Sequence, residues 1–542
     1  MAPTSALALA SAAESVILGR YAPSPYIISN SVFTRTAILF SIQLLLWYTW
    51  SCLIYPYFFS PLRHLPQPKG GHWLMGHFAK IRRENNGEPS REWTETVPND
   101  GLIYYRFAFN SERVLLTSPK ALAEVLVHKS YDFVKPSMIR HGIGRILGIG
   151  ILLAEGEEHK RQRRLLMPAF HFRHVKDLYQ VFWSKAQEAT RAMTDAVHQP
   201  SEQPDKPSSV QDAASWASRA TLDIIGVAGM GKDFGAIANP NSELILTYRS
   251  VFAPNDVARI LQLLGFFIPF SILRRLPLKR NMDVDEAAQT IKRVAREIIQ
   301  SKRRELEKRE RTDIDIVSVA LESGGFSDED LVNQMMTFLA AGHETTATSM
   351  TWAAYLLSKH PDIQKRLRDE IRTNLPSVDS TTEVTSTDID RLPYLNAVCN
   401  EVLRFYAPVP QTLRVTVKDT TILGHFIPKD TVIILSPMAI NTSKALWGDD
   451  AREFNPDRWM GPGRANTGGA DSNYSFLTFL HGPRSCIGQA FAKAEFACLL
   501  AAWVGRFEME LVDPDTPLEL VSGVTARPKG GLSVKLKAVD GW

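Results

Sequence analysis

Cysteine is scarce in this chain, and its cysteines are not spaced as metal or disulfide sites require. There are four among 542 residues, and no Cys-x-x-Cys pair occurs, which excludes a common kind of structural zinc site. Four thiols in so long a chain do not make a disulfide framework, so we expect a reducing compartment. The four are Cys52, Cys399, Cys486 and Cys498.

The chain also lacks a large excess of charge of either sign. Its net charge is +4 at pH 7, and 22% of its residues are charged, as in ordinary globular proteins. The densest basic stretch, residues 302–311, is interleaved with Glu305, Glu307 and Glu310, which indicates a solvated helix face. We therefore expect no nucleic-acid partner.

One long run near the N-terminus lacks charge altogether. Residues 37–59 read AILFSIQLLLWYTWSCLIYPYFF, enough to cross roughly 30 Å of hydrocarbon as a helix. We predict a transmembrane anchor at 37–59 that ends near Pro56, after an N-terminal segment 1–36 and before a proline-rich hinge at 60–71. A buried core helix is the alternative. The milder apolar run at 6–18 is a candidate second membrane contact.

The remaining residues, 72–542, predict a mainly α-helical globule with small β-sheets. Alternating apolar residues at 102–107 and 113–117 predict two strands, and further strands are expected at 416–423 and 431–435. Helical periodicity predicts long helices at 285–309, 327–359 and 361–375. The glycines at 142, 144 and 148 do not have the spacing of a dinucleotide-binding loop, and we interpret that stretch as a loop.

The segment 479–488, FLHGPRSCIG, is the most specific pattern in the chain. Gly482 and Gly488 permit a tight turn that directs backbone N–H groups at the sulfur of Cys486. The start of the following helix and the charge of Arg484 favour a thiolate. A thiolate bound to haem iron pushes electron density onto the metal and favours O–O cleavage. A buried structural cysteine is the alternative.

This loop resembles the haem-binding signature of the cytochrome P450 family, and the resemblance runs from about Leu65 to the C-terminus. It implies one large helical globule that encloses haem b, with Cys486 as the iron ligand. It also implies that the conserved positions of the loop contact the cofactor. These are Phe479, Gly482, Arg484 and Gly488.

A second motif, AAGHETT at 340–346, lies in the predicted helix 327–359. Ala341, Glu344 and Thr345 share one helix face. We expect Ala341 and Gly342 to leave room beside the cofactor, and the Thr345 hydroxyl to bond back to its own helix. The resemblance implies that Glu344 and Thr345 relay protons during catalysis. Without the thiolate loop, they would be ordinary helical side chains.

Two sets of charged residues are expected around the haem. Glu401 and Arg404 lie three residues apart on one helix face, and the resemblance implies that Arg458 joins them in a buried structural cluster. Cations for the haem propionates are expected from the predicted helix near 157 and from two further arginines. The candidates are His159, Arg163, Arg414 and Arg484, with His159 at a position where the family commonly has tryptophan.

The resemblance implies a monooxygenase that inserts one atom of O₂ into a lipophilic small molecule, with secondary metabolism as the expected setting. It also implies a separate flavoprotein reductase that supplies electrons from NADPH, and an endoplasmic reticulum membrane location with a single span and a cytosolic catalytic domain. Lys160, Arg161 and Arg164 form a candidate basic face for that donor, and a solvated charged face is the alternative. The apolar stretch 258–280 is expected to dip into the membrane, and the pocket walls are expected at 133–153, 340–341, 409–413 and 523–524.

Two other functions remain open from the sequence. The first is a haem-thiolate isomerase or dehydratase that uses no O₂, against which the intact Glu344–Thr345 pair argues. The second is a haem-binding carrier or sensor without turnover, which would need neither that pair nor a basic donor face.

Overall fold

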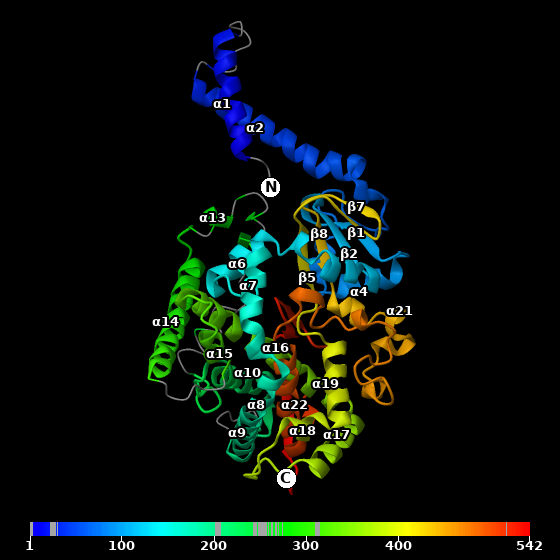
Figure 1. The fold of residues 1–542 in the computed structure, drawn as a ribbon. Coiled ribbons are helices and arrows are strands. Elements are labelled where there is room, and N and C mark those ends of the chain that lie inside the picture. Colours follow the sequence, from blue (N-terminus) through cyan, green and yellow to red (C-terminus); the bar gives the residue numbers. More distant parts are fainter. Residues whose placement is uncertain are drawn as a thin grey trace.

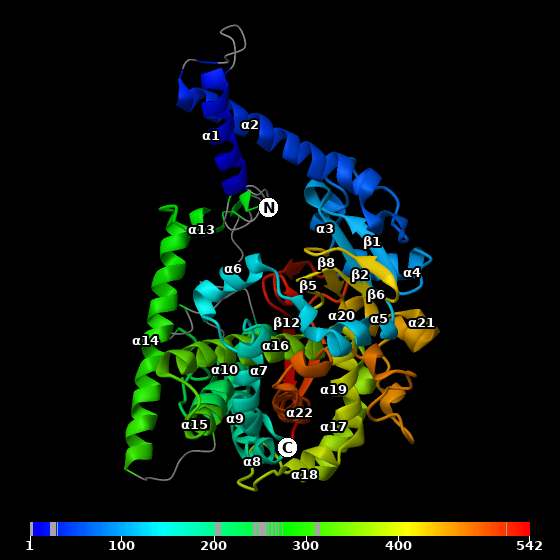
Figure 2. The ribbon, with the colours of Figure 1, turned by 45° about the horizontal axis from the view of Figure 1, so that its top comes forward.

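The computed structural model describes residues 4–21, 29, 31–200, 207–241, 275–308, 315–515 and 517–542, with 247, 257, 260–261, 264–265, 268 and 270–273. Helices α1 (Thr4–Tyr21) and α2 (Val32–Thr49) extend from one end of the molecule, and the C-terminus lies at the opposite end (Figure 1). Between them, the β-sheet occupies one side of the body and most helices the rest (Figures 1 and 2).

The N-terminal apolar run forms one continuous helix that is long and apolar enough to cross a membrane. Helix α2 leads directly into a π-helix, Trp50–Phe59, and together they span 28 residues with a mean hydropathy of 1.7. The apolar stretch is not buried against the protein. The helix begins at Val32 rather than at residue 37, because Ser31 caps the first turn by accepting from the N–H of Thr34.

The prediction that the helix ends near Pro56 is wrong. The π-helix continues to Phe59, and the N–H of Ser60 donates to the carbonyl of Tyr55 at 2.9 Å. The bonding from residue i to i+5 differs from the α-helical pattern in which a proline ring meets the carbonyl four residues earlier. The chain turns at Ser60, whose hydroxyl caps the 3₁₀ helix Pro61–His64.

Helix α1 packs along α2. Arg35 of α2, which is buried, donates to the carbonyls of Ser15 at 3.2 Å and Ser29 at 2.7 Å. The Gln43 amide donates to the carboxylate of Glu14 at 2.7 Å. The apolar run at 6–18 is therefore one arm of a helical hairpin with the apolar helix, and its contact with a membrane stays a prediction.

The largest sheet has five strands in the order β1-β2-β8-β5-β3. Strands β2 and β8 are parallel, and the other neighbours are antiparallel. The predicted strands at 102–107, 113–117 and 431–435 are confirmed, whereas the expected strand at 416–423 is divided. Strand β5 ends at Thr416, and a separate hairpin begins at Thr420 and turns at Leu423 and Gly424, both with positive φ. The strands are β1 (Leu102–Arg106), β2 (Glu112–Leu116), β3 (Phe133–Val134), β5 (Thr412–Thr416), β6 (Thr420–Ile422), β7 (His425–Ile427) and β8 (Val432–Leu435).

Helix α16 (Asp328–Lys359) is the centre of the helical part. It packs against α10 (Ala213–Ile224), α14 (Lys279–Glu307), α19 (Pro393–Phe405) and α22 (Gln489–Arg506). Its first turn has the capping box that Ser327 and Asp330 predict, with each side chain bonded to the backbone of the other residue. The faces that meet around α16 form the largest apolar core of the protein.

The stretch containing Gly142 and Gly144 is helical, so its interpretation as a loop is wrong. Helix α6 (Ser137–Leu147) includes both glycines and ends at Gly148, whose φ is +69°. Ile143, Ile146 and Leu147 lie at helical spacing and pack on the core, and this burial outweighs the low helix propensity of glycine.

The remaining elements complete the helical shell and two small sheets, β4-β12-β9 and β10-β11. The helices are α3 (Phe78–Arg83), α4 (Glu88–Thr96), α5 (Pro119–Ala123), α7 (Gly156–Leu166), α8 (Phe172–Asp177), α9 (Tyr179–His198), α13 (Phe270–Leu273), α15 (Ile316–Glu322), α17 (Pro361–Asn374), α18 (Ser386–Asp390), α20 (Pro437–Asn441) and α21 (Lys444–Trp447). The strands are β4 (Val210–Asp212), β9 (Phe507–Leu511), β10 (Leu520–Ser522), β11 (Ala526–Pro528) and β12 (Ser533–Ala538).

Candidate active site

The cysteine loop turns tightly between a short 3₁₀ helix, Gly482–Arg484, and α22. Gly482 has φ +77°, and a Cβ there would lie 2.2 Å from the carbonyl oxygen of Leu126, so no other residue fits. The N–H of Cys486 donates to the carbonyl of Phe479 at 2.9 Å. The partly buried ring of Phe479 packs at the edge of the core. The loop therefore has the fold that its glycine pattern predicts at Gly482.

Gly488 contributes differently from what the pattern suggests. Its φ is −88°, which every residue type adopts, and a Cβ there would meet only the ring of Phe170 at 3.7 Å. The backbone N–H of Gly488 points at the Cys486 sulfur and lowers the pKa of the thiol. Gly488 thus supplies the expected N–H group, but it needs no special backbone angle to do so.

The electrostatics at Cys486 combine opposing effects. The side chain is accessible although protein atoms surround it, and this desolvation raises the pKa of the thiol. The N–H of Gly488 and the charge of Arg163 lower it. Arg163 also donates to the Ser485 carbonyl at 2.7 Å. A reachable sulfur with these two neighbours can bind a metal as the thiolate.

Arg484 was expected to add positive charge beside the sulfur, and this expectation is wrong. Its guanidinium forms an ion pair with Glu155 and donates to the carbonyls of Ser130 and Phe133, and Arg484 is not among the groups that shift the pKa of Cys486. Arg163, which reaches the loop from α7, takes the place beside the thiol. Two residues of sequence separation do not determine where a long side chain points.

Arg484 belongs to a group of buried or nearly buried basic side chains, here called the cation cluster: Lys135, His159, Arg414 and Arg484. The His159 Nδ1 lies 3.2 Å from the Tyr131 hydroxyl, and Arg414 donates to the Leu413 carbonyl at 2.8 Å. Glu155 is the carboxylate that pairs with this cluster in the described structure, bonding Arg484 and lying 3.7 Å from the Lys135 Nζ.

Burial and repulsion by nearby cations depress the pKa values of Lys135, His159 and Arg414. Burial first, and then the nearby arginines, lower the pKa of Lys135 to about 7. Burial and Arg484 likewise lower the pKa of His159 to about 4 and of Arg414 to about 10. The Nε of Arg484 is buried without a hydrogen-bond partner in the described part of the chain. Lys135, Arg414 and Arg484 supply more positive charge than Glu155 balances, and neutral His159 adds a ring N–H donor. The cluster can therefore accommodate further anionic groups, as the two propionates of haem require.

The candidate proton-relay residues lie together on α16, but each bonds elsewhere. The Thr345 hydroxyl donates to the carbonyl of Ala341 at 2.6 Å, as predicted. The Glu344 carboxylate accepts from the Thr525 hydroxyl at 2.7 Å, and the Arg527 guanidinium lies 3.9 Å away. No local sequence pattern points to Thr525 or Arg527, which the fold brings to α16.

The small residues of the same motif have two different roles. Ala341 is exposed on the face that carries Thr345, as a residue beside a cofactor would be. Gly342 is not on that face: a Cβ there would lie 2.9 Å from the side chain of Ile225. The expectation that Gly342 makes room for the cofactor is therefore wrong, because its small size serves close packing between α16 and a neighbouring helical turn.

Glu401, Arg404 and Arg458 meet in one buried cluster, as predicted. Arg404 donates to both carboxylate oxygens of Glu401 at 2.7 Å, and Arg458 donates to one of them at 3.2 Å. The indole of Trp459 and the N–H of Asn455 also donate to this carboxylate, each at 2.9 Å. Glu401 and Arg404 have no exposed surface. Arg404 completes its bonding to the carbonyls of Asn441, Ala451 and Glu453.

The candidate basic face on α7 is more nearly neutral than its sequence suggests. Lys160 pairs with Glu157 at 2.6 Å, and Arg161 pairs with Glu158 at 2.7 Å. Arg164 is exposed. The residues three positions earlier on the helix thus offset two of the three charges.

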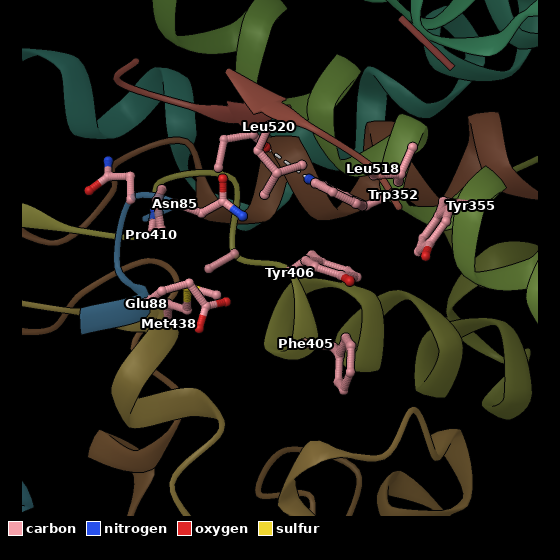
Figure 3. A pocket seen from close by; sticks show the side chains of 13 residues that line it. Asn85, Glu88, Trp352, Tyr355, Phe405, Tyr406, Pro410, Met438, Leu518 and Leu520 are labelled. Carbon is pink, nitrogen blue, oxygen red and sulfur yellow. Dashed lines mark hydrogen bonds between the residues drawn. The ribbon is translucent and has the colours of Figure 1, made fainter. Parts of the chain in front are cut away.

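A separate cavity of about 190 Å³ lies between α4, the C-terminal half of α16, the end of α19 and the segment leading into β10 (Figure 3). Aromatic side chains dominate one side of it, namely Trp352, Tyr355, Phe405 and Tyr406. In the described structure its lining includes no residue of the loop 479–488, so we do not assign it to the thiolate site.

Known proteins of one family match most of the chain. The profile of the cytochrome P450 family matches residues 66–535. The chain is 50% identical over 494 residues to cytochrome P450 monooxygenase sphH of Aspergillus fumigatus, covering 90% of each protein. It is 43% identical over 559 residues to cytochrome P450 monooxygenase ALT8 of Alternaria alternata, covering 92% of this chain and 93% of the relative.

A third relative, cytochrome P450 monooxygenase FUM15 of Gibberella moniliformis, is 41% identical over 572 residues, covering 96% of each protein. Likeness to monooxygenases over nearly the whole chain shows an oxidoreductase of that type, and the family implies a haem cofactor. The chain belongs to the cytochrome P450 family.

Proposed function

We propose that Cys486 binds the iron of haem b as a thiolate, and that the protein oxidises a lipophilic small molecule by hydroxylation or epoxidation. The observation that carries this proposal is the accessible Cys486 thiol beside the N–H of Gly488 and the Arg163 guanidinium. Both neighbours favour a negatively charged sulfur. Phe479 and Gly482 shape the loop around it, Gly482 because only glycine fits beside the Leu126 carbonyl.

The cation cluster would hold the haem propionates. Lys135, His159, Arg414 and Arg484 supply charge and N–H donors that Glu155 alone does not balance. The sequence motifs point to His159, Arg414 and Arg484 but not to Lys135 or Glu155. Arg163, which bonds the Ser485 carbonyl, would act mainly on the thiolate loop.

Bound haem would supply the reduction and cleavage of O₂. The N–H of Gly488 and the charge of Arg163 would help to keep the Cys486 sulfur negatively charged. Glu344 would carry protons from the protein surface to the face of α16 that bears Thr345. The Glu401–Arg404–Arg458 cluster would hold the end of α19 and the segment after residue 450 in place. One oxygen atom would enter a C–H or C=C bond of the substrate, and the other would leave as water with two electrons from NADPH.

The electrons would come from a separate NADPH-dependent flavoprotein reductase. We propose that this donor binds near α7. Exposed Arg164 is the strongest candidate contact there, because Glu157 and Glu158 offset the charges of Lys160 and Arg161.

We propose the endoplasmic reticulum membrane as the location, with Val32–Phe59 as the span and a cytosolic body. Much of the stretch 258–280 lies outside the described residues. Within it, Ile260, Leu264, Ile272 and Leu276 are exposed, as membrane-contacting side chains would be. A lipophilic substrate dissolved in the bilayer, such as an intermediate of secondary metabolism, would reach the site from there.

The test is a carbon monoxide difference spectrum of the reduced full-length protein, followed by NADPH-driven oxygen consumption with an added reductase. We expect the long-wavelength band of thiolate-bound haem and sustained oxygen consumption. A thiolate band without oxygen consumption would support an isomerase, dehydratase or carrier instead. Absence of the band in a haem-loaded protein would contradict the proposal.

A further inference from the structure

The hairpin formed by β10 and β11 contacts the carboxylate of Glu344, a residue of α16, through a hydrogen bond. The Thr525 hydroxyl, at the turn of this hairpin, donates to Glu344 Oε1 at 2.7 Å. Thr525 is only 4% exposed, whereas the Arg527 side chain, 3.9 Å from the same oxygen, is 42% exposed. Glu344 Oε1 therefore meets both a buried neutral donor and a cation open to solvent.

The backbone around Thr525 is fixed, so its hydroxyl has little freedom to point elsewhere. The N–H of the next residue, Ala526, donates to the Pro408 carbonyl at 3.0 Å. The Ala526 carbonyl accepts from the indole N–H of Trp352 at 2.9 Å (Figure 3). Trp352 is buried and stacks on Tyr406 with ring centres 3.9 Å apart.

Trp352 and Glu344 both belong to α16, eight positions apart, so the hairpin is attached to this helix at two points. Ala526, the first residue of β11, lines the cavity of Figure 3, while Thr525 just before it reaches Glu344. The Thr345 hydroxyl is bonded to Ala341 and takes no part in holding Glu344.

From this geometry we infer that Thr525 is a positioning residue for the proton relay: its hydroxyl sets the orientation of the Glu344 carboxylate, with Arg527 at the solvent side. The inference rests on the proposed relay role of Glu344. Without the hydroxyl, the carboxylate can rotate toward Arg527 and solvent. Small displacements of a reacting group slow a reaction strongly.

The test compares Thr525→Val, which removes the hydroxyl at nearly constant shape, with Thr525→Ser, which retains it. Full-length proteins are placed in phosphatidylcholine vesicles with a P450 reductase, and NADPH and O₂ consumption are followed in H₂O and D₂O without added substrate. One NADPH per O₂ means that hydrogen peroxide leaves, whereas two NADPH per O₂ mean complete reduction to water. Glu344→Ala is the reference for loss of the relay.

We expect Thr525→Val to slow NADPH oxidation by about tenfold. The ratio of the rate in H₂O to the rate in D₂O should increase, and more hydrogen peroxide should be released. The same changes are expected of Glu344→Ala. Thr525→Ser should behave as the wild type. An effect of Glu344→Ala without one of Thr525→Val would overturn the inference and leave the relay in place. No effect of either variant would refute the relay itself.

A second readout does not depend on turnover. Because the two side chains are bonded, the loss of melting temperature in the double variant Thr525→Val/Glu344→Ala should be smaller than the sum of the two single losses. Additive losses would show that the contact does not exist in solution and would overturn the inference. Carbon monoxide spectra of all variants check that each has folded and bound haem, and Thr525→Ala replaces Thr525→Val if the latter does not fold.

Discussion

At the scale of single residues, Glu495 is a buried acid that has no charged partner among the residues that the structure describes. It lies in α22 with no exposed surface, and neither carboxylate oxygen has a hydrogen-bond partner in the described structure. The hydroxyl of Thr346 is the polar group beside it. Burial raises the pKa of Glu495 well above its usual range, so the folded protein holds this group protonated and neutral.

This burial predicts a pH-dependent effect of Glu495→Gln. The unfolded chain releases the Glu495 proton above about pH 4.3 while the folded chain keeps it, so folding stability is lost as the pH rises toward the folded pKa. Glutamine has no such proton. For each pH unit above about pH 4.3, Glu495→Gln should gain up to about 1.4 kcal/mol of folding stability relative to the wild type.

Thermal unfolding at a series of pH values between 4 and 8 measures the effect. Glu322→Gln is the control, because Glu322 is exposed at the end of α15. The difference in stability between this variant and the wild type should not change with pH. If the difference in stability between Glu495→Gln and the wild type is also independent of pH, the Glu495 carboxyl is ionised in the folded protein.

Replacing Glu401, by contrast, should destabilise the protein, because its carboxylate is paired with buried arginines. Glu401→Ala leaves Arg404 buried without its counter-charge and leaves Arg458 with Asp450 alone, which costs about 3–5 kcal/mol. Haem content per mole of protein and urea unfolding should both show the loss. Glu297→Ala, which breaks the exposed pair with Arg293, should cost less than about 1 kcal/mol. Full haem content and stability in Glu401→Ala would refute the structural role of the cluster.

At the scale of the element, the two glycines of the cysteine loop should respond differently to the same substitution. In Gly482→Ala the new Cβ would lie 2.2 Å from the Leu126 carbonyl, at φ +77°. Strain of about 1–3 kcal/mol and a displaced loop should follow. In Gly488→Ala the nearest new contact is at 3.7 Å with ordinary φ. The carbon monoxide spectrum should therefore lose the thiolate band in the first variant and keep it in the second; equal loss in both would contradict this account.

The elements also show how far the sequence could predict the site. The loop around Cys486 and the pair Glu401–Arg404 are local patterns, because backbone geometry alone brings residues within a turn together. The bonds from Arg484 to Glu155 and from Thr525 to Glu344 span 329 and 181 residues. Partners that far apart are set by tertiary packing, which a single sequence does not reveal.

Local proximity was misleading in two places for the same reason. Arg484 is two residues from Cys486 but points to Glu155, and the side chain beside the sulfur is Arg163 from α7. Gly342 lies next to Ala341 but faces Ile225. The direction of a side chain depends on the backbone turn and on its neighbours, not on the number of residues between two positions.

At the scale of the whole molecule, we predict two separate contacts with the membrane. Deleting residues 1–60 should lower but not abolish binding to phospholipid vesicles, because exposed Ile260, Leu264 and Ile272 lie outside the deleted helices. Serine at these three positions in the shortened protein should remove most of the remaining binding.

Vesicle flotation measures this binding, and serine at exposed Val417 and Val512, elsewhere on the body, is the control. If the triple variant binds vesicles as well as the shortened parent does, the stretch 258–280 is not a membrane contact.

The ligation of haem iron by Cys486 is the central claim, and the reduced carbon monoxide spectrum of Cys486→Ser tests it most directly. Cys399→Ser is the matched control, because Cys399 is buried in α19, outside the loop. We predict that Cys486→Ser loses the thiolate band and NADPH-driven oxygen consumption, whereas Cys399→Ser keeps both. An unchanged thiolate band in Cys486→Ser would contradict the assignment of the iron ligand.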